Sequence, residues 1–329
     1  MSELAFAEQT VELDIAGKPQ QATLTLPAAS SDHDDSATTQ HRAAVLLLTD
    51  NGPMDRNQNT VHAQLNIFNQ VAHHLAERGI ISLRYDKRGC GLSKGKFDAA
   101  GHSDLLQDAQ AWLDHFIKLP RVAGLPVFLL GHGEGALMAS RLCADNRAIA
   151  GQVLITPFVE DYESIIRRQA ENALRDIEQL EGFKGKVIRF FVKINGDQLA
   201  KQKKLISRIR KSRRDTLKIR KQVINAKWIR EMVNLDAQAI YEKVDTPSLI
   251  IGGEKDLQCR PEDTPRVAAL LKGPTEHHLL SDLTHILRPD PATPSVQHYL
   301  KLSIEDIDPR LLSLTSNWFD QQLAQEPIV

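Results

Sequence analysis

The spacing of apolar residues changes near residue 43. Before that point, residues 11–15 and 22–26 alternate apolar and polar side chains on either side of the turn signal Gly17-Lys18-Pro19, which predicts a β-hairpin closed by Pro27. Residues 28–42 are polar and low in complexity, so we expect a surface loop. The Asp and His side chains of this loop leave metal binding as an alternative to a solvated insertion.

After residue 43, short apolar runs alternate with stretches whose apolar residues follow helical spacing. We predict strands at 43–48, 80–85, 127–130, 153–155, 248–251 and 277–280, helices at 61–75, 105–116, 136–145 and 261–271, and a last helix opened by Asp308-Pro309. This alternation predicts βαβ units, and hence an α/β fold with a mostly parallel sheet flanked by helices. Such a sheet binds ligands at the carboxyl ends of its strands.

The alternation stops between residues 160 and 243, where charged residues are dense. A strand-like run at 187–194 is the one exception, and the apolar residues between 206 and 228 lie near a 3.5-residue spacing that predicts an amphipathic helix or helix pair. We therefore expect one core domain, formed by residues 1–156 and 246–329. A helical, strongly basic cap of residues 157–245 interrupts it.

The charge of the chain is a cancellation. The 41 Lys and Arg residues against 42 Asp and Glu leave a net charge of −1, which argues against a chain-wide polyanion binder. Residues 201–230, however, hold 13 Lys and Arg and a single acid, Asp215. This run is either a solvated helix face or a cap that attracts anionic ligands, such as acyl-CoA-like or phosphorylated molecules, or an acidic membrane surface. Nucleic acid is disfavoured because no aromatic interleaving accompanies the charge.

Targeting and redox signals point to the cytoplasm. The longest apolar run, residues 43–48, is far shorter than the ~20 residues that span a bilayer, and the first eight residues carry no secretory signal. The three cysteines, Cys90, Cys143 and Cys259, are too widely spaced and odd in number for a disulfide framework or a paired zinc motif. We expect a cytoplasmic protein without a transmembrane segment; the sequence says nothing about its oligomeric state.

Polar side chains follow several predicted strands at the edge where parallel sheets carry out chemistry. They lie in residues 49–56, 86–93 and 131–135, with Asp256 after the strand at 248–251 and His285 after the strand at 277–280. Asp86 is best interpreted as a hydrogen-bonding anchor of its own turn. Cys90 is interpreted as a packed thiol.

These loops resemble those of the α/β-hydrolase superfamily, specifically a bacterial branch with loops like GSGPxDRN, LRYDKRGCGxS and GHSEGA. The resemblance runs from about residue 9 to the C-terminus and is most specific at residues 84–91. It implies an α/β-hydrolase fold related to esterases, thioesterases and serine aminopeptidases. It also implies a catalytic order of nucleophile, acid and histidine, which Gly133, Asp256 and His285 follow, with the insert where the family places its cap.

The nucleophile itself is missing. The G-x-S-x-G elbow reads Gly131-His132-Gly133-Glu134-Gly135, so position 133 has no hydroxyl and no acyl-enzyme can form there. Glycine tolerates the strained turn at little steric cost. The backbone N–H groups of Asn51 and Glu134 fit the two oxyanion-hole donors, and Asp256 would orient His285. Neither Ser140 nor Thr156 compensates for the missing hydroxyl, and a water in its volume, activated by His285, would be a route to weak hydrolysis.

A rival motif occupies the same turn. Gly131-x-Gly133-x-x-Ala136 matches the G-x-G-x-x-A dinucleotide fingerprint, but it follows the third strand rather than the first. The acid expected about 20 residues on is also absent, since that position holds residues 155–157. We predict no cofactor and no metal.

Three hypotheses follow. The first is a pseudoenzyme of hydrolase-like fold that binds a small acyl-type or anionic ligand under its cap. The second is an active hydrolase of ester, thioester or amide bonds in which His285 activates water. The third is an engineered Ser-to-Gly change that inactivates the enzyme.

Overall fold

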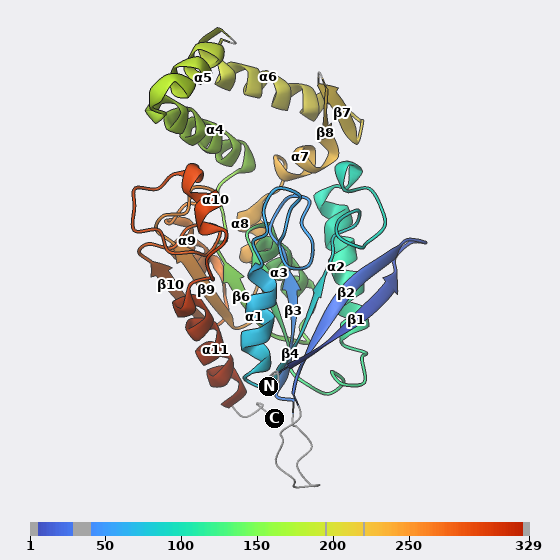
Figure 1. The fold of residues 1–329 in the computed structure, drawn as a ribbon. Helices are drawn as coiled ribbons and strands as arrows, with labels where there is room; N and C mark the ends of the chain where they lie inside the picture. Colours follow the sequence, from blue (N-terminus) through green and yellow to red (C-terminus); the bar gives the residue numbers. More distant parts are fainter. Residues whose placement is uncertain (1–5, 29–40, 195, 220, 325–329) are drawn as a thin grey trace.

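The computed structural model describes residues 6–28, 41–194, 196–219 and 221–324 (Figure 1). Most of the predicted surface loop, residues 29–40, lies outside the described residues. Eight strands form one sheet, in the order β1 (Phe6–Asp14), β2 (Pro19–Pro27), β4 (Ile80–Tyr85), β3 (Ala43–Leu48), β5 (Val127–His132), β6 (Ile149–Ile155), β9 (Ser248–Gly253) and β10 (Thr275–Leu280). The first two strands are the predicted hairpin and pair antiparallel, and β2 also pairs antiparallel with β4. The remaining pairs of this sheet, from β4 through β3, β5, β6 and β9 to β10, are parallel.

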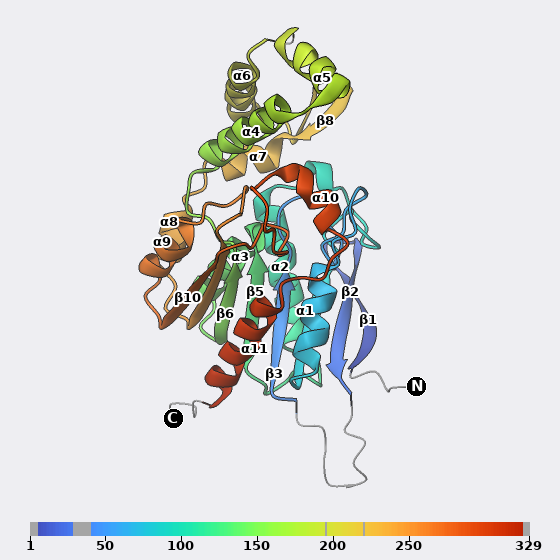
Figure 2. The same ribbon diagram turned by 60° about the vertical axis from the view of Figure 1, so that its left-hand side comes forward.

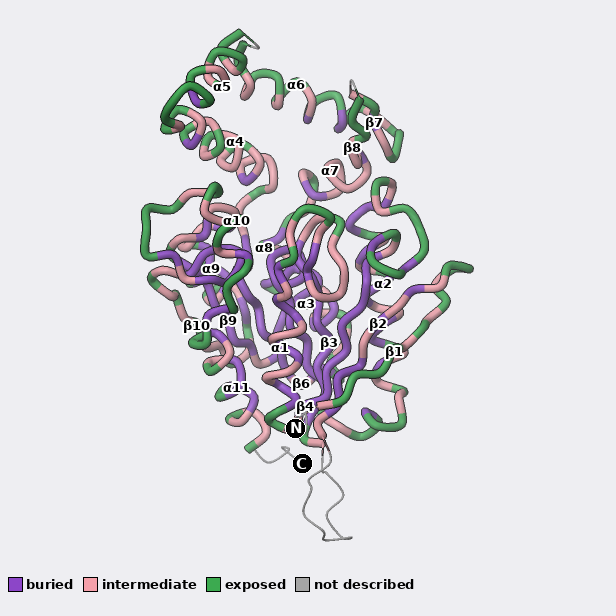
Figure 3. The backbone as a smooth tube through the Cα atoms, viewed as in Figure 1, coloured by how far each residue is buried: buried purple, intermediate pink, exposed green. Residues whose placement is uncertain are grey.

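Helices cover both faces of this sheet, as the alternation predicts. Strand β3 shows why, because alternate residues enter two separate apolar cores: Ala44, Leu46 and Leu48 pack on one face, and Ala43, Val45 and Leu47 on the other. The first core is closed by α2 (His102–Phe116), α3 (Glu134–Asp145), α8 (Ala237–Tyr241) and α9 (Asp263–Leu270), and the second by α1 (Ile67–Ala76) and α11 (Pro309–Ala324). The buried interior follows the sheet in Figure 3.

Helix α1 begins six residues later than the apolar spacing predicts. Val61 is 90% exposed and lies in a loop rather than on the helix. The Asp55 carboxylate accepts the backbone N–H of Asn59, and the Asn59 and Asn66 side chains hydrogen-bond each other, so this segment folds as a closed loop. The loop ends at Asn66, whose φ of 47° is left-handed and prevents an earlier start to the helix.

The segment between β6 and β9 contains α4 (Tyr162–Gln179), α5 (Gly182–Ile194), α6 (Gln198–Lys211), β7 (Thr216–Ile219), β8 (Gln222–Asn225), α7 (Ala226–Met232) and α8. We call residues 160–243 the insert. Its elements α4 to α7 lie beyond the carboxyl ends of the parallel strands, and α5 lies farthest from the sheet (Figures 1 and 2). Among the described residues, no helix is both long and apolar enough to span a bilayer.

Two sequence predictions within the insert are wrong. Residues 187–194 belong to helix α5 rather than to a strand. The apolar residues between 206 and 228 do not form a helix or helix pair throughout, because β7 and β8 make an antiparallel hairpin in their middle. Leu217 and Ile224 are paired across this hairpin and pack with Ile209 of α6 in a small separate core. Helical spacing and hairpin pairing place these residues on one face equally well, and only the packing separates them.

Candidate functional site

Gly133 lies at the sharp turn between β5 and α3. Its φ of 54° and ψ of −113° are rarely adopted by residues with a side chain. The turn is tight as well, since a Cβ on Gly131 would lie 2.1 Å from the carbonyl oxygen of Gly135. This strand–turn–helix geometry is that of a nucleophile elbow, with a glycine at its apex.

The structure brings Asp256 and His285 to this turn. Asp256 follows β9, and its Oδ1 accepts the backbone N–H groups of Gln258 and Cys259 at 2.7 and 2.8 Å. Its Oδ2 is 2.8 Å from Nδ1 of His285, which follows β10. Both side chains are buried. The predicted acid and histidine therefore meet as a hydrogen-bonded pair beside Gly133.

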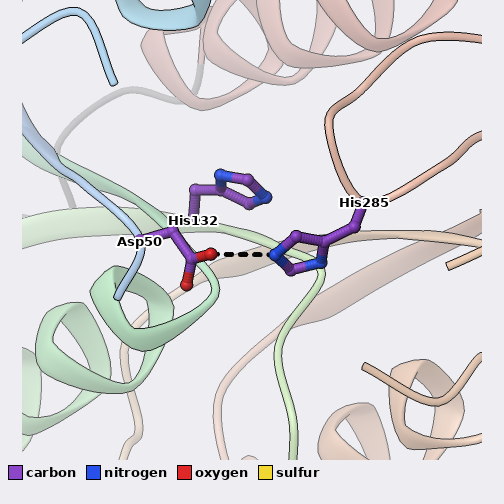
Figure 4. A group of neighbouring side chains, drawn as sticks. All are labelled: Asp50, His132 and His285. Atoms are coloured by element: carbon purple, nitrogen blue, oxygen red, sulfur yellow. Dashed lines mark hydrogen bonds and ion pairs between the residues drawn. The ribbon is translucent and has the colours of Figure 1, made fainter. Parts of the chain in front are cut away.

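The space beside Gly133, where the sequence left room for a water, holds the carboxylate of Asp50, a residue that follows β3. A Cβ on Gly133 would lie 1.9 Å from Asp50 Oδ1. That oxygen accepts the backbone N–H of Glu134 at 3.0 Å, and Oδ2 is 2.8 Å from Nε2 of His285 (Figure 4). The Asp50 carboxylate is thus placed as the product carboxylate of a hydrolase would be, with one oxygen on an oxyanion donor and one on the histidine.

Two carboxylates flank His285 and determine its charge. Burial acts to lower the pKa of His285, but the charges and hydrogen bonds of Asp256 and Asp50 overcome it and raise that pKa well above its ordinary value. Burial likewise acts to raise the pKa of Asp50, but His285, His132 and the N–H of Glu134 outweigh it and lower that pKa. Nδ1 and Nε2 of His285 each lie 2.8 Å from a carboxylate oxygen, an arrangement that favours the protonated ring.

His132 is the residue before Gly133 and lies against His285, with ring centroids 4.8 Å apart. Its Nδ1 is 2.8 Å from Oε1 of Gln58, and its Nε2 is buried without a hydrogen-bond partner among the described residues. Burial and the nearby positive charge of His285 lower the pKa of His132 to about 4, so the ring is neutral.

Both residues predicted to supply oxyanion-hole donors, Asn51 and Glu134, lie next to Gly133, but their surroundings differ. The N–H of Glu134 is engaged by Asp50, and Asn51 lines the pocket in front of Gly133. The Glu134 side chain is buried, and its Oε1 lies 2.7 Å from His102 Nδ1 and 2.8 Å from Trp228 Nε1. Because Trp228 belongs to α7, this carboxylate ties the elbow to the insert, a link that sequence spacing does not reveal.

The residues around residue 86 support the loop that carries Asp50. Asp86 accepts the backbone N–H and two side-chain N–H groups of Arg56 and the backbone N–H of Leu92, so its predicted role as a turn anchor is confirmed. Lys87 is buried and donates to the carbonyl oxygens of Asp50 and Gly52. Cys90 is buried, as predicted, and burial raises the pKa of its thiol to about 11.

A small pocket of about 10 Å³, the space of about one water molecule, lies in front of this cluster. Its core side is lined by Asn51, Gly133 and His285, and its insert side by residues of and just before α4, among them Tyr162 and Ile165. A second, larger hollow lies within the insert and is lined by α6 and the β7–β8 hairpin, including Lys204 and Arg208.

Two groups of side chains in the site have the composition of metal ligands, although the sequence predicted none. Asp50, His132 and His285 form one, and Asp256, Cys259 and His285 the other, with the ligand atoms of each group within 4.8 Å of one another. The first group combines residues that lie far apart in the chain, and in the second only Asp256 and Cys259 are near neighbours, so no metal-binding spacing motif marks either group.

Sequence reasoning passed over Asp50. A signal was present, because aligning residues 50–57 with the loop pattern GSGPxDRN places Asp50 at its first glycine. The chain departs from these patterns at residues 50, 51 and 133, and two of the departures touch: an acid replaces glycine at 50, and glycine replaces serine at 133.

Comparison with protein families supports the superfamily resemblance. A family model described as serine aminopeptidase, S33 matches residues 61–291, which is more than half of the chain. Over 279 residues the chain is 23% identical to esterase EstD of Thermotoga maritima, a match that covers 84% of this chain and 61% of that relative. It is 24% identical over 232 residues to polyketide transferase GrgF of a Penicillium species, covering 67% of this chain and 76% of that protein.

Solved structures show the same fold. Est1E of Butyrivibrio proteoclasticus with bound ferulic acid superposes with a TM-score of 0.60 at 17% identity, covering 96% of this chain and all of that one. The α/β hydrolase GrgF superposes with a TM-score of 0.61 at 17% identity, covering 97% of this chain and all of that one. At these identities the likeness establishes the architecture alone.

Proposed function

Because the chain belongs to the serine aminopeptidase, S33 family of α/β hydrolases yet holds Gly133 at the apex of its nucleophile elbow, we propose that it binds a small acyl-type or anionic ligand without serine-type hydrolysis. The observation that carries this proposal is the position of Asp50. Its carboxylate takes both the space of a serine side chain and the N–H of Glu134, so the two features that a serine hydrolase needs at this point are each occupied.

The alternatives fit the geometry less well. Activation of water by His285 requires a free ring nitrogen, and both nitrogens of His285 are hydrogen-bonded to carboxylates. An isolated engineered Ser-to-Gly change would leave a void at residue 133, whereas here a second residue fills it. The paired departure at residues 50 and 133 therefore supports a site rebuilt as a unit.

The pocket between core and insert is the proposed ligand site. Tyr162 and Ile165 supply an apolar wall toward α4, and the elbow supplies the polar floor. Because the pocket has room for only about one water molecule, a short acyl chain or a small anion would enter only as the side chains of the core and of α4 move apart. The insert would then act as a cap over this site.

Restoring the missing hydroxyl tests the proposal. Gly133→Ser alone must push Asp50 aside, so we expect neither p-nitrophenyl ester turnover in the presence of a chelator nor labelling by a fluorophosphonate probe. Gly133→Ser/Asp50→Gly frees the space and the Glu134 N–H, and we expect it to be labelled. The matched control is Gly133→Ala/Asp50→Gly, which has no hydroxyl. Chelator-resistant turnover by the unaltered protein that is lost in His285→Ala would overturn the proposal.

We further propose that the insert docks on an anionic membrane surface through α5. This helix turns its apolar side outward: Phe183, Val187, Phe190 and Ile194 recur as one stripe at helical spacing, and Phe183 and Phe190 are 81% and 61% exposed. The opposite side faces the protein, since Gly185 packs closely on Leu180.

The charge around this stripe matches an anionic lipid surface. Helix α5 carries four Lys and Arg residues and no acid, and residues 182–214 together hold twelve Lys and Arg against Asp197 alone. Exposed Lys184, Lys186 and Lys193 flank the stripe. Basic residues beside an exposed apolar helix face are typical of helices that lie in a membrane interface.

A further inference from the structure

We propose that Asp50, His132 and His285 form a zinc site at the position left by the missing serine, with Asp50 Oδ2 and the Nε2 atoms of His132 and His285 as ligands. The inference goes beyond the proposed function, which requires only that residue 133 does no serine chemistry. Figure 4 shows the three side chains converging from the β3 loop, the end of β5 and the loop after β10.

The distances are close to those of a zinc centre. One ligand atom from each of the three residues lies within 4.8 Å of the others, and Asp50 Oδ2 is 2.8 Å from His285 Nε2. Zinc bonds of about 2.0–2.2 Å place tetrahedral donor atoms roughly 3.3–3.6 Å apart. The most widely separated ligand atoms would therefore have to approach by at most about 1.5 Å, and Asp50 Oδ2 and His285 Nε2 would have to move apart by about 0.5–0.8 Å.

Each proposed ligand is already held by a partner on its other side. His285 Nδ1 is hydrogen-bonded to the Asp256 carboxylate, His132 Nδ1 to Oε1 of Gln58, and Asp50 Oδ1 to the N–H of Glu134. Such outer contacts fix the tautomer and orientation of metal ligands. With Nδ1 of both imidazoles engaged, both Nε2 atoms face the centre.

His132 supplies an independent observation. It is 2% exposed, and its Nε2 has no hydrogen-bond partner among the described residues. A buried nitrogen without a partner is costly, and a metal would satisfy it. In the same binding event, zinc would replace the proton between His285 Nε2 and Asp50 Oδ2.

The donor set selects the metal. Two imidazole nitrogens and one carboxylate oxygen suit zinc, which in catalytic sites takes three protein ligands and leaves a fourth position for water or substrate. The fourth position would face the small pocket that Asp50 and His285 line, which has room for one water. The second group is less suited, because none of its described side-chain nitrogen or oxygen atoms is buried without a hydrogen-bond partner, whereas His132 Nε2 of the first group is.

The fourth position of the zinc would take one of two oxygens. It would bind the carbonyl or carboxylate oxygen of the ligand that the proposed function assigns to the pocket, or it would hold a water that supplies the nucleophile that residue 133 lacks. In the second case the bound water would give one proton to solvent and its oxygen would bond to the acyl carbon. The bond from that carbon to the leaving group would then break, and the leaving group would take up a proton from solvent.

Metal binding can be measured directly, without any substrate. We expect chelator-treated protein dialysed against zinc to retain one equivalent by elemental analysis. Cobalt at the same site should give the visible absorption of a tetrahedral centre. Gln58→Ala should weaken zinc binding by about 10–100-fold because it removes an outer contact. Asp50→Asn and His132→Gln, which change ligands themselves, should each weaken it by at least about tenfold. All variants are compared with the parent in metal-free thermal unfolding.

The matched control is His298→Gln/Asp290→Asn, which removes another hydrogen-bonded His–Asp pair outside the site. We expect its zinc content and cobalt spectrum to be unchanged. Less than a tenth of an equivalent of zinc in folded parent protein would overturn the proposal. Binding that survives His132→Gln unchanged would also overturn it and would place the metal elsewhere. If the parent protein binds no zinc and is also not labelled by the fluorophosphonate probe, the zinc site is refuted and the proposed function still stands.

Discussion

The Asp50 carboxylate lies where a side chain on residue 133 would begin: a Cβ on residue 133 would lie 1.9 Å from Asp50 Oδ1. Gly133 also adopts a φ of 54°, which costs a residue with a Cβ about 1–3 kcal/mol. The two residues therefore depend on each other, and substitutions at them should not act additively.

The first prediction concerns this dependence. Gly133→Ala should lower the free energy of unfolding by more than the conformational strain alone, and Asp50→Gly should remove the excess, giving a coupling of about 0.5–3 kcal/mol in urea unfolding. Gly124→Ala is the control for strain without contact, because Gly124 has a φ of 86° and nothing lies within 4 Å of its added Cβ. Equal losses in Gly124→Ala and Gly133→Ala would contradict the close contact with Asp50.

The second prediction concerns the anchor of the residue 86 turn. Asp86 and Arg56 form a salt bridge with side chains that are 2% and 11% exposed, and Asp86 also accepts the N–H of Leu92. Asp86→Ala leaves the Arg56 charge buried without its partner, so we expect a loss of about 3–5 kcal/mol in urea unfolding.

Asp145→Ala is the control for the Asp86 experiment, because it breaks an exposed pair with Arg141 on one helix. It should cost no more than about 0.5 kcal/mol. A loss of that size in Asp86→Ala would show that the turn does not depend on its carboxylate.

The third prediction concerns pH and the contact between core and insert. Asp104 of α2 is 2.6 Å from Lys227 of α7. Burial acts to raise its pKa, but Lys227, the N–H of Gly101 and Arg88 lower it below its ordinary value of 3.8. A lowered pKa means that the carboxylate stabilises the fold at pH values above 3.8, and that this contribution is lost as the pH falls through the folded-state pKa.

Asp104→Asn tests that sign. The variant should be less stable than the parent at neutral pH, and the difference should shrink as the pH falls below about 4, where the parent carboxylate is protonated as well. Thermal unfolding from neutral pH to pH 3 measures it. Asp114→Asn, a change on the exposed side of the same helix, is the control. A difference that grows on acidification would contradict the assignment.

The fourth prediction concerns the outward stripe of α5. The protein should co-sediment with phosphatidylcholine vesicles that contain phosphatidylglycerol and not with phosphatidylcholine alone. Raising NaCl from about 0.1 to 1 M should release it, because the Debye length falls from about 10 to 3 Å. Phe183→Ser/Phe190→Ser should lower the partition coefficient at least about tenfold by removing buried apolar area. Binding that ignores both lipid charge and these substitutions would rule out docking through α5.

Charge-removing variants, and control substitutions at equally exposed residues elsewhere, distinguish docking through α5 from nonspecific adsorption to vesicles. Converting Lys184, Lys186 and Lys193 to Gln should weaken binding on the order of a hundredfold, at about 1 kcal/mol for each charge near the surface. The controls leave α5 intact: Val61→Ser/Leu300→Ser removes two other exposed apolar side chains, and Lys118, Lys272 and Lys301 changed to Gln remove three other exposed charges. Self-association through α5 in sedimentation velocity without vesicles would reassign the stripe to a second copy of the chain.

Local pattern was enough for much of the core. The parallel strands, the turn after β5 and the sequence positions of Asp256 and His285 each follow from residues within a few places of one another, and the structure brings them to one sheet edge. In the insert, by contrast, helical spacing and hairpin pairing place Leu217 and Ile224 on one face equally well, so periodicity alone chose the wrong element.

The sequence by itself determined that residue 133 has no nucleophile, because a missing hydroxyl is a property of one residue. Only the tertiary structure decided what takes its place. Asp50 and His285 are 235 positions apart, and their contact depends on where β3, β5 and β10 end in the assembled sheet. The outward face of α5 was likewise hidden, since a stripe of apolar residues has the same spacing whether it points toward a core or away from it.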